Sequence, residues 1–185
     1  MIEPTPVVWL MGPTSAGKTT LASALSDRLR TQWDVPVVHW DGDQVREMLG
    51  ETLDFSPQSR LHVVRTLAVL AFSTSQAGVL TVVSALTAHD DARRLIRKRL
   101  PRLLIVFVKC PVETCMERDP KGLYRQAAAE KIDTLIGYNS NYTPPPTPDL
   151  ELDTSSETVE VCVQRLADFL GGHKLLPNRQ AMNAK

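Results

Sequence analysis

The sequence predicts an α/β protein in which a parallel sheet is covered by helices on both faces. Short apolar runs rich in β-branched residues recur along the chain, and segments of helical length with apolar residues three and four apart lie between them. The 185 residues suit a single domain, which we expect to span residues 1–172, followed by a tail at 173–185.

The element boundaries follow from these patterns. The expected strands are Val7–Met11, Val35–Trp40, Val79–Ser84, Leu103–Lys109 and, more weakly, Leu150–Leu152. The expected helices include Gly17–Arg30 and Pro57–Ala77. Ser56 can cap the second of these helices, Pro57 suits its first turn, and Gly78 is well placed to end it. In such a sheet, ligands bind beyond the carboxyl ends of the strands, so the loops there are the place to look for function.

The composition excludes several classes of protein. Lys and Arg total 21 and Asp and Glu total 21, and this formal neutrality argues against a general nucleic-acid binder. The longest apolar run, Leu103–Val108, is far too short to cross a membrane. The three cysteines show no C-x-x-C spacing, which is typical of reduced thiols, and we therefore expect a cytoplasmic protein.

The loop after the first expected strand carries the clearest motif. Residues 12–19 read GPTSAGKT and fit G-x-x-x-x-G-K-[ST], with a strand before and a helix after. Backbone N–H groups of such a loop converge on phosphate oxygens, Lys18 reaches the β- and γ-phosphates, and the Thr19 hydroxyl binds Mg²⁺. A chance glycine-rich turn is the alternative. The residues expected to bind ATP are Gly12, Thr14, Ser15, Ala16, Gly17, Lys18, Thr19 and Thr20.

A second polar segment follows the second expected strand. Asp41 and Asp43 flank Gly42, so both carboxylates can turn toward bound phosphates, where phosphoryl transfer needs a metal partner and a group that orients the attacking hydroxyl. Arg46 can clamp an anionic acceptor, since a guanidinium matches phosphate or sulfate oxygens bidentately. The alternative is an acidic turn that merely caps the helix beginning near Asp43.

These motifs together resemble the adenylylsulfate kinase family. The resemblance runs from about Val7 to Leu170. The segments that carry it are the phosphate loop, DGDQVR at 41–46, DFSP at 54–57, Arg60, RDPKGLY at 118–124, GYNS at 137–140, Tyr142, Pro144 and LELDT at 150–154. The run DPKGLY at 119–124 is its most specific part.

The resemblance implies a three-layer P-loop kinase fold with a mobile lid at about 118–148. The family transfers the γ-phosphate of ATP to the 3′-hydroxyl of adenylyl sulfate, giving 3′-phosphoadenylyl sulfate, and a homodimer is common. The resemblance implies that Asp43 is the base or orients the attacking hydroxyl and that Asp41 supports the metal or its waters. It also implies that Phe55 stacks on the acceptor adenine and that Arg118 binds the nucleotide. The remaining residues implied to bind the acceptor are Arg46, Arg60, Thr87, Lys121 and Leu135.

Several acceptor positions depart from the family pattern. Val63 replaces an asparagine, Asp90 an arginine and Leu135 a stacking aromatic, whereas Thr87 keeps a hydroxyl where the family has serine. Two alternatives therefore remain open: a kinase acting on another hydroxyl, in a modified nucleotide or small metabolite, and a non-catalytic nucleotide-binding domain. The segment with Asp90 either reshapes the acceptor pocket or caps the helix that follows it.

Overall fold

A computed structural model of the chain describes residues 3–50, 53–173 and 175–176. Within these residues, five parallel strands form one sheet in the order β2-β3-β1-β4-β5. The strands are β1 (Val7–Met11), β2 (Val37–Asp41), β3 (Leu80–Ala85), β4 (Leu103–Lys109) and β5 (Leu150–Asp153). The predicted α/β class with a parallel sheet is confirmed.

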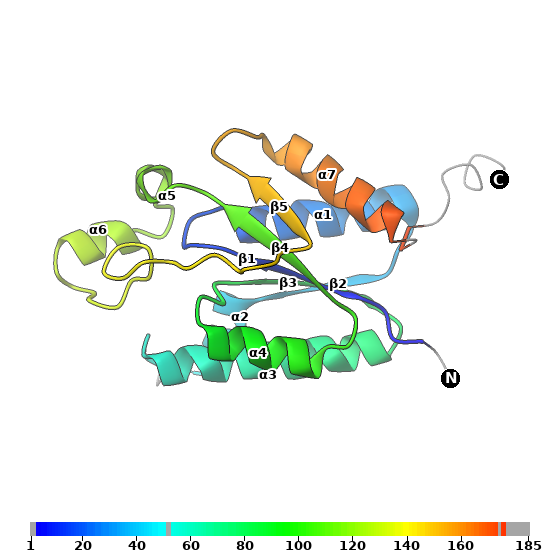
Figure 1. Cartoon of the computed structure of the whole chain (residues 1–185), viewed down its shortest axis with the longest axis horizontal. Helices are drawn as coiled ribbons and strands as arrows, with labels where there is room; N and C mark the ends of the chain where they lie inside the picture. Colours follow the sequence, from blue (N-terminus) through cyan, green and yellow to red (C-terminus); the bar gives the residue numbers. More distant parts are fainter. Residues whose placement is uncertain (1–2, 51–52, 174, 177–185) are drawn as a thin grey trace.

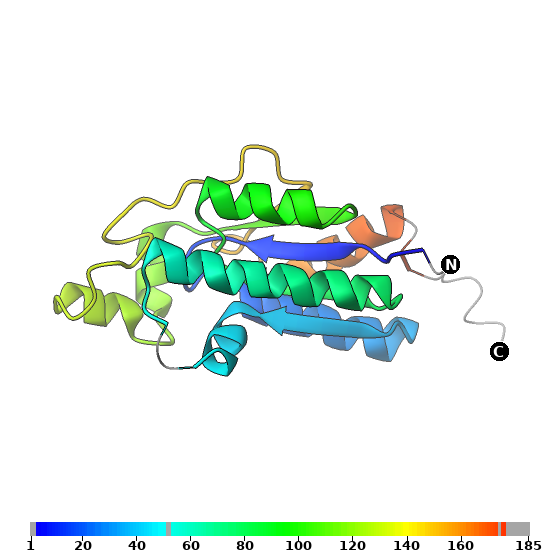
Figure 2. The ribbon, with the colours of Figure 1, turned by 90° about the horizontal axis from the view of Figure 1, so that it is seen from below.

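Helices cover both faces of this sheet (Figures 1 and 2). On one face lie α1 (Lys18–Trp33) and α7 (Val159–Gly172), and on the other lie α2 (Gly42–Met48), α3 (Pro57–Gln76) and α4 (Asp90–Arg99). Two short helices, α5 (Val112–Arg118) and α6 (Leu123–Ala128), follow β4. No helix within the described residues is long and apolar enough to cross a membrane.

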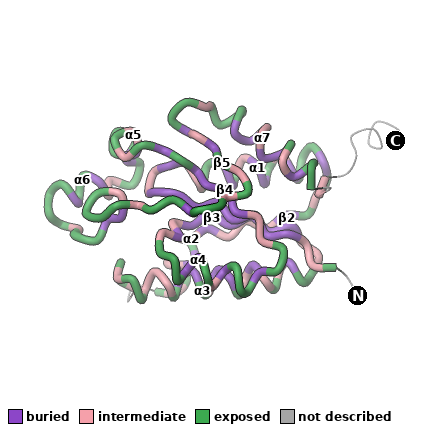
Figure 3. Tube along the Cα trace, viewed as in Figure 1, coloured by how far each residue is buried: buried purple, intermediate pink, exposed green. Residues whose placement is uncertain are grey.

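The central strand β1 shows how the sequence builds two cores. All five of its residues are buried. Val8 and Leu10 pack with α1 and α7, while Trp9 and Met11 pack with α3 and α4, because successive side chains of a strand point to opposite faces. The continuous apolar runs of β1 and β4 are therefore what a sheet buried on both faces requires. Figure 3 shows buried residues in the central sheet, between the two layers of helices.

The bounds predicted for β1 and β4 are confirmed, and those of the other predicted strands and helices differ by one to three residues. The second strand begins at Val37 instead of Val35, because Pro36 has no N–H to donate to the sheet. The Ser56 hydroxyl caps α3 by accepting the Ser59 N–H at 3.3 Å, as predicted. Gly78 has a φ of 79°, which glycine adopts without strain just after a helix.

The parallel arrangement places the carboxyl ends of all strands at one edge of the sheet. The segment 118–148, predicted as the lid and so named below, begins at the end of α5, includes α6, and projects from this edge (Figure 1). Of the predicted tail at 173–185, residues 174 and 177–185 lie outside the described residues.

Candidate active site

A cavity of about 760 Å³ opens at the carboxyl edge of the sheet. Its walls come from the loops after β1, β2, β3 and β5, from α3, and from the lid. The predicted site residues that line it are Thr14, Ser15, Gly17, Lys18, Thr19, Thr20, Asp41, Asp43, Arg46, Phe55, Arg60, Thr87, Arg118, Lys121 and Leu135. The fold thus gathers residues spread over 122 positions of sequence, from Thr14 to Leu135, around one space.

The phosphate loop runs from β1 to the start of α1. Gly17 has a φ of 91° and precedes the first residue of α1, so the loop turns sharply into the helix. Gly12 and Ala16 were also expected to bind ATP, but they are not among the residues that line the cavity. A Cβ on Gly12 would come within 2.2 Å of the Val108 carbonyl oxygen, and Ala16 is fully buried. Both residues serve the packing of the loop against the sheet.

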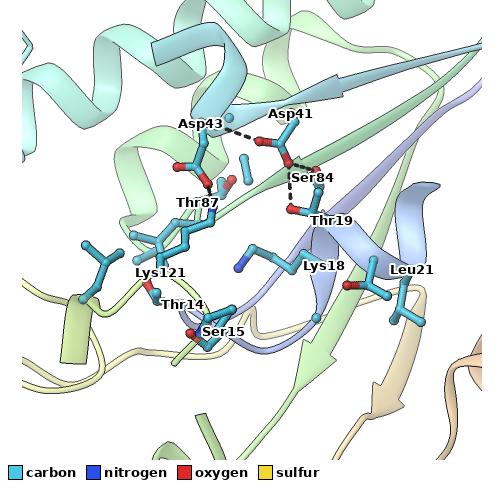
Figure 4. Close-up of a pocket in the computed structure, with 18 of the residues that line it drawn as sticks. Thr14, Ser15, Lys18, Thr19, Leu21, Asp41, Asp43, Ser84, Thr87 and Lys121 are labelled. Carbon is cyan, nitrogen blue, oxygen red and sulfur yellow. Dashed lines mark hydrogen bonds and ion pairs between the residues drawn. The ribbon is translucent and has the colours of Figure 1, made fainter. Parts of the chain in front are cut away.

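Lys18 projects from the start of α1 into the cavity (Figure 4). Its ammonium donates to the Pro13 carbonyl oxygen at 2.7 Å. Desolvation by burial lowers the pKa of Lys18 to about 8, although the carboxylates of Asp43 and Asp41 act in the opposite direction. A phosphate that approaches the Lys18 ammonium would favour its charged form and raise its pKa again.

Asp41 is the centre of a hydrogen-bond network at the end of β2. Its carboxylate accepts the hydroxyls of Thr19 at 2.8 Å and Ser84 at 2.5 Å (Figure 4). It also accepts the backbone N–H groups of Asp43 at 2.9 Å and Gln44 at 3.4 Å. Burial acts to raise the pKa of Asp41, but these hydrogen bonds outweigh it and hold the pKa below its usual value.

The contacts of Asp41 bear on both interpretations of the acidic segment, as a helix cap and as part of the phosphoryl-transfer site. Asp41 is the N-cap of α2, so one of the acids does cap a helix, as the alternative interpretation proposed. Asp41 nevertheless also faces Thr19 of the phosphate loop and lines the cavity. His39, two residues earlier on the same face of β2, is hydrogen-bonded through Nε2 to the Ser84 hydroxyl at 2.8 Å. Ser84 was not predicted as a site residue.

Asp43 reaches across the cavity to the lid. Its carboxylate forms an ion pair with the ammonium of Lys121 (Figure 4). The two side chains are 66% and 52% exposed, respectively, so solvent screens the pair. Because α2 supplies Asp43 and the lid supplies Lys121, the pair connects a sheet-edge residue with the lid across the space where substrates would meet.

Two arginines and one aromatic ring form the far wall. The guanidinium carbons of Arg46 and Arg60 lie 4.8 and 5.6 Å from the centre of the Phe55 ring. Arg46 also donates to the Asp54 carbonyl oxygen at 2.7 Å, and Arg60 donates to that of Thr134, in the lid, at 2.7 Å. Both guanidinium groups are thus held by neutral carbonyl oxygens, and their charge is available to bind an anionic ligand.

The positions that depart from the family pattern divide into two groups. Val63 and Leu135 line the cavity and present apolar atoms to it, and both are 5% exposed. Asp90 does not line the cavity: it lies in the first turn of α4 with its side chain 73% exposed. The interpretation of Asp90 as a changed acceptor contact is therefore wrong for this structure. The N-cap of α4 is His89, which makes no side-chain capping hydrogen bond, and Asp90 lies in the first turn, where an acid is favourable beside the positive end of the helix.

The wall opposite the acceptor side includes residues that sequence reasoning missed. Arg118 donates to the backbone carbonyl oxygen and, at 3.2 Å, to the hydroxyl of Thr154. The missed lining residues here are Thr154, Glu157, Thr158, Val159 and Cys162. These residues follow β5, and the carboxyl end of β5 lies at the same edge of the sheet as those of the other strands. The rule that ligands bind beyond the carboxyl ends of parallel strands therefore applied to this segment as well.

Comparison with known proteins agrees with this geometry. The family model described as adenylylsulphate kinase matches residues 5–153. An adenylyl-sulfate kinase of Synechococcus sp. (strain JA-2-3B'a(2-13)) is 36% identical over 163 residues, which cover 88% of this chain and 93% of that protein. This chain belongs to the adenylylsulfate kinase family. A probable adenylyl-sulfate kinase of Archaeoglobus fulgidus is 38% identical over 148 residues, covering 80% of this chain and 95% of that protein.

A solved structure extends the similarity to three dimensions. The Mycobacterium tuberculosis APS kinase, determined in complex with AMPPNP and APS, superimposes with a TM-score of 0.86 and is 30% identical. The match covers 91% of this chain and 98% of that one. As a member of the adenylylsulfate kinase family, the protein is an ATP-dependent phosphotransferase with a hydroxyl group as acceptor, and the family uses ATP with Mg²⁺.

Proposed function

We propose that the protein transfers the γ-phosphate of ATP to the 3′-hydroxyl of adenylyl sulfate, giving 3′-phosphoadenylyl sulfate and ADP. The observation that carries the proposal is the arrangement of one cavity, with the phosphate loop at one side, the cations Arg46 and Arg60 at the other, and Asp43 between them. The similarity to relatives named adenylyl-sulfate kinase supports the same acceptor.

The nucleotide occupies the side of the cavity formed by the phosphate loop. Backbone N–H groups at the start of α1 and the Lys18 ammonium bind the β- and γ-phosphates, because the helix end and the cation both favour negative charge. Arg118, tied to Thr154, closes this side of the cavity over the nucleoside. The positive groups then stabilise the charge that develops on the transferred phosphoryl group.

Mg²⁺ fits this site as an ion held mainly by the nucleotide. No cluster of three or more His, Cys, Asp or Glu side chains suited to a metal occurs in the part of the chain that the structure describes. The Thr19 hydroxyl and the Asp41 carboxylate lie 2.8 Å apart, and both are oxygen donors of the kind Mg²⁺ takes together with phosphates and waters. When bound, the ion neutralises phosphate charge.

Asp43 acts on the attacking hydroxyl. Its carboxylate projects into the cavity between the phosphate loop and the acceptor wall, where it can accept the proton of the 3′-hydroxyl. Its partner Lys121 comes from the lid, so closure of the lid brings a cation to the reacting phosphates as it covers them. A closed lid also excludes water, which protects ATP from hydrolysis.

The acceptor is bound with fewer specific contacts than the family pattern provides. Arg46 and Arg60 bind the phosphosulfate, Phe55 stacks on the adenine, and Thr87 offers a hydroxyl, but Leu135 supplies no second ring. Stacking of a base on an aromatic side chain is worth about 1–3 kcal/mol. We therefore expect a higher KM for adenylyl sulfate than a site with both rings would show.

We also place the protein in the cytoplasm, as a homodimer. The described cysteines, Cys110, Cys115 and Cys162, are all buried free thiols, which agrees with a reducing compartment. The dimer follows from the family resemblance, and size-exclusion chromatography with light scattering tests it. Neither nucleic acid nor a membrane is expected as a partner, given a formal net charge of zero.

A coupled assay of ADP release with Mg-ATP, run with and without micromolar adenylyl sulfate, tests the proposed reaction. Saturable release that depends on adenylyl sulfate, together with the 3′-phosphorylated product by mass spectrometry, is the expected result. ATP binding without release would show that the acceptor is another hydroxyl compound, and a screen of modified nucleotides and small metabolites would follow. Release stimulated by none of these would favour the non-catalytic alternative.

A further inference from the structure

A buried arginine on α4, Arg93, joins two segments that are far apart in sequence. The acceptor loop (residues 86–89) follows β3 and lines the cavity, and the lid exit (residues 142–144) lies near the C-terminal end of the lid. The Arg93 Nε donates to the Thr87 carbonyl oxygen at 3.0 Å. The two terminal nitrogens of Arg93 donate to carbonyl oxygens of the lid exit, those of Thr143 and, at 3.2 Å, Pro144.

The charge of Arg93 is poorly compensated for a residue so deeply buried. Its side chain is 5% exposed. Among the described residues the one carboxylate within ion-pair distance is that of Asp90, at 3.4 Å, and its side chain is 73% exposed. The Tyr142 ring lies 5.8 Å from the guanidinium carbon. An apolar side chain of similar size is often no less stabilising than such a buried charge, so stability alone does not account for an arginine at this position.

The acceptor loop contains a strained residue that needs to be held. Thr87 has a φ of 42°, a left-handed conformation that is unusual for a β-branched residue and costs on the order of 1–3 kcal/mol. Its hydroxyl accepts the ring N–H of Trp9 at 2.9 Å, and its carbonyl oxygen accepts Arg93. All three side chains are buried, so the sharp turn of this loop is maintained from both the sheet and α4.

We propose that Arg93 is a positioning residue that holds the acceptor loop and the lid exit in one arrangement, so that Thr87 faces the acceptor when the lid closes. The guanidinium fork reaches both segments at once, which a single apolar or ammonium group cannot do. At its beginning the lid is held by Arg118, which donates to Thr154 after β5. One arginine thus holds the lid at its beginning, and another holds it near its end. This inference rests on the proposed function.

The kinetic test compares Arg93→Met with Arg97→Met. Arg97 lies one turn further along α4 and is exposed. It donates to the carbonyl oxygen of Thr147, in the lid, at 3.3 Å, and among the described residues it has no hydrogen bond to the acceptor loop, so it is a control for the contact with that loop. Arg93→Met is expected to raise the KM for adenylyl sulfate at least tenfold and to change the KM for ATP less than about twofold. Arg93→Lys should recover part of the loss, and Arg97→Met should change neither constant. Equal increases in both KM values for Arg93→Met would overturn the proposal.

Hydrogen exchange provides a readout that needs no acceptor. In Arg93→Met, amides of the acceptor loop and of residues 142 and 143 should exchange faster than in the wild type, while Arg97→Met leaves the acceptor loop unchanged. Unchanged exchange in both segments of Arg93→Met would overturn the proposal. If Arg93→Met does not fold, Arg93→Lys takes its place in both experiments. A wild type that fails to phosphorylate adenylyl sulfate refutes the proposed function, and exchange still decides the role of Arg93.

Discussion

Replacement of Asp43 by asparagine separates catalysis from stability in this site. The Asp43–Lys121 pair is the one ion pair of Asp43 among the described residues, and its side chains are 66% and 52% exposed. Such an exposed pair contributes about 0–1 kcal/mol to the free energy of unfolding. The loss of a general base, by contrast, lowers turnover by about 10²–10⁴-fold, which corresponds to roughly 2.7–5.4 kcal/mol in the activation barrier.

The assay measures kcat for 3′-phosphoadenylyl sulfate formation, the affinity for ATP and the free energy of unfolding in urea. We expect a large fall in kcat for Asp43→Asn, an ATP affinity within about threefold of the wild type, and unfolding free energy within about 1 kcal/mol. Asp27→Asn is the control, because Asp27 also forms an exposed ion pair, with Arg30 on α1, and does not line the cavity. Turnover of Asp43→Asn within tenfold of the wild type would refute the role given to Asp43.

Three further predictions concern other parts of the cavity. Ser84→Ala removes the 2.5 Å hydrogen bond to the buried Asp41, so it should lower the free energy of unfolding by about 1–3 kcal/mol and raise the Mg²⁺ concentration for half-maximal activity. Burial lowers the pKa of Lys18 to about 8, and bound phosphates favour its charged form. Above about pH 8, ATP binding should therefore be accompanied by the uptake of a proton, and the affinity for ATP should fall as the pH rises further. Calorimetry in buffers of different ionisation enthalpy measures that uptake. Leu135→Phe adds a ring to the acceptor wall and should lower the KM for adenylyl sulfate about tenfold or more.

The outcomes that contradict these predictions are distinct. An unchanged Mg²⁺ requirement in Ser84→Ala would show that Asp41 keeps its place without that hydroxyl. The lowered pKa of Lys18 also predicts how the free energy of unfolding changes with pH. The pKa in the folded state lies below the unfolded value of 10.5, so the unfolded state binds more protons between about pH 8 and 10.5. The free energy of unfolding of the ligand-free protein should therefore rise over that interval. A fall in the free energy of unfolding between pH 8 and 10.5 would contradict the lowered pKa of Lys18. An unchanged KM in Leu135→Phe would remove the stacking argument.

Local sequence patterns were sufficient for much of the fold. The bounds of β1 and β4 were predicted to the residue, since strands buried on both faces read as continuous apolar runs. The cap at Ser56 and the turn at Gly78 were predicted because each depends on one residue and its immediate neighbours. The phosphate loop was found for the same reason, as all of its backbone geometry lies within eight consecutive residues.

The acceptor side shows where such reasoning fails. From the sequence, Asp90 stands where the family has an arginine and was considered as a changed contact, yet the first turn of α4 directs its carboxylate to solvent. Arg93, three residues later in the basic run at 93–99, is buried. The helical period places a side chain on a face of its helix, but which face is covered depends on the segments packed against it, here residues 142–144.

By itself, the sequence determined the class of the fold, the nucleotide loop and the family to which the chain belongs, because these depend on residues that are contiguous or regularly spaced. The tertiary structure decided which distant side chains meet. The register that pairs Asp41 with Ser84 across β2 and β3 creates the network around the Asp41 carboxylate. Likewise, Arg93 and the lid exit come together only because α4 packs beside the returning chain. Such contacts depend on strand order, register and helix packing, which no local pattern in the sequence encodes.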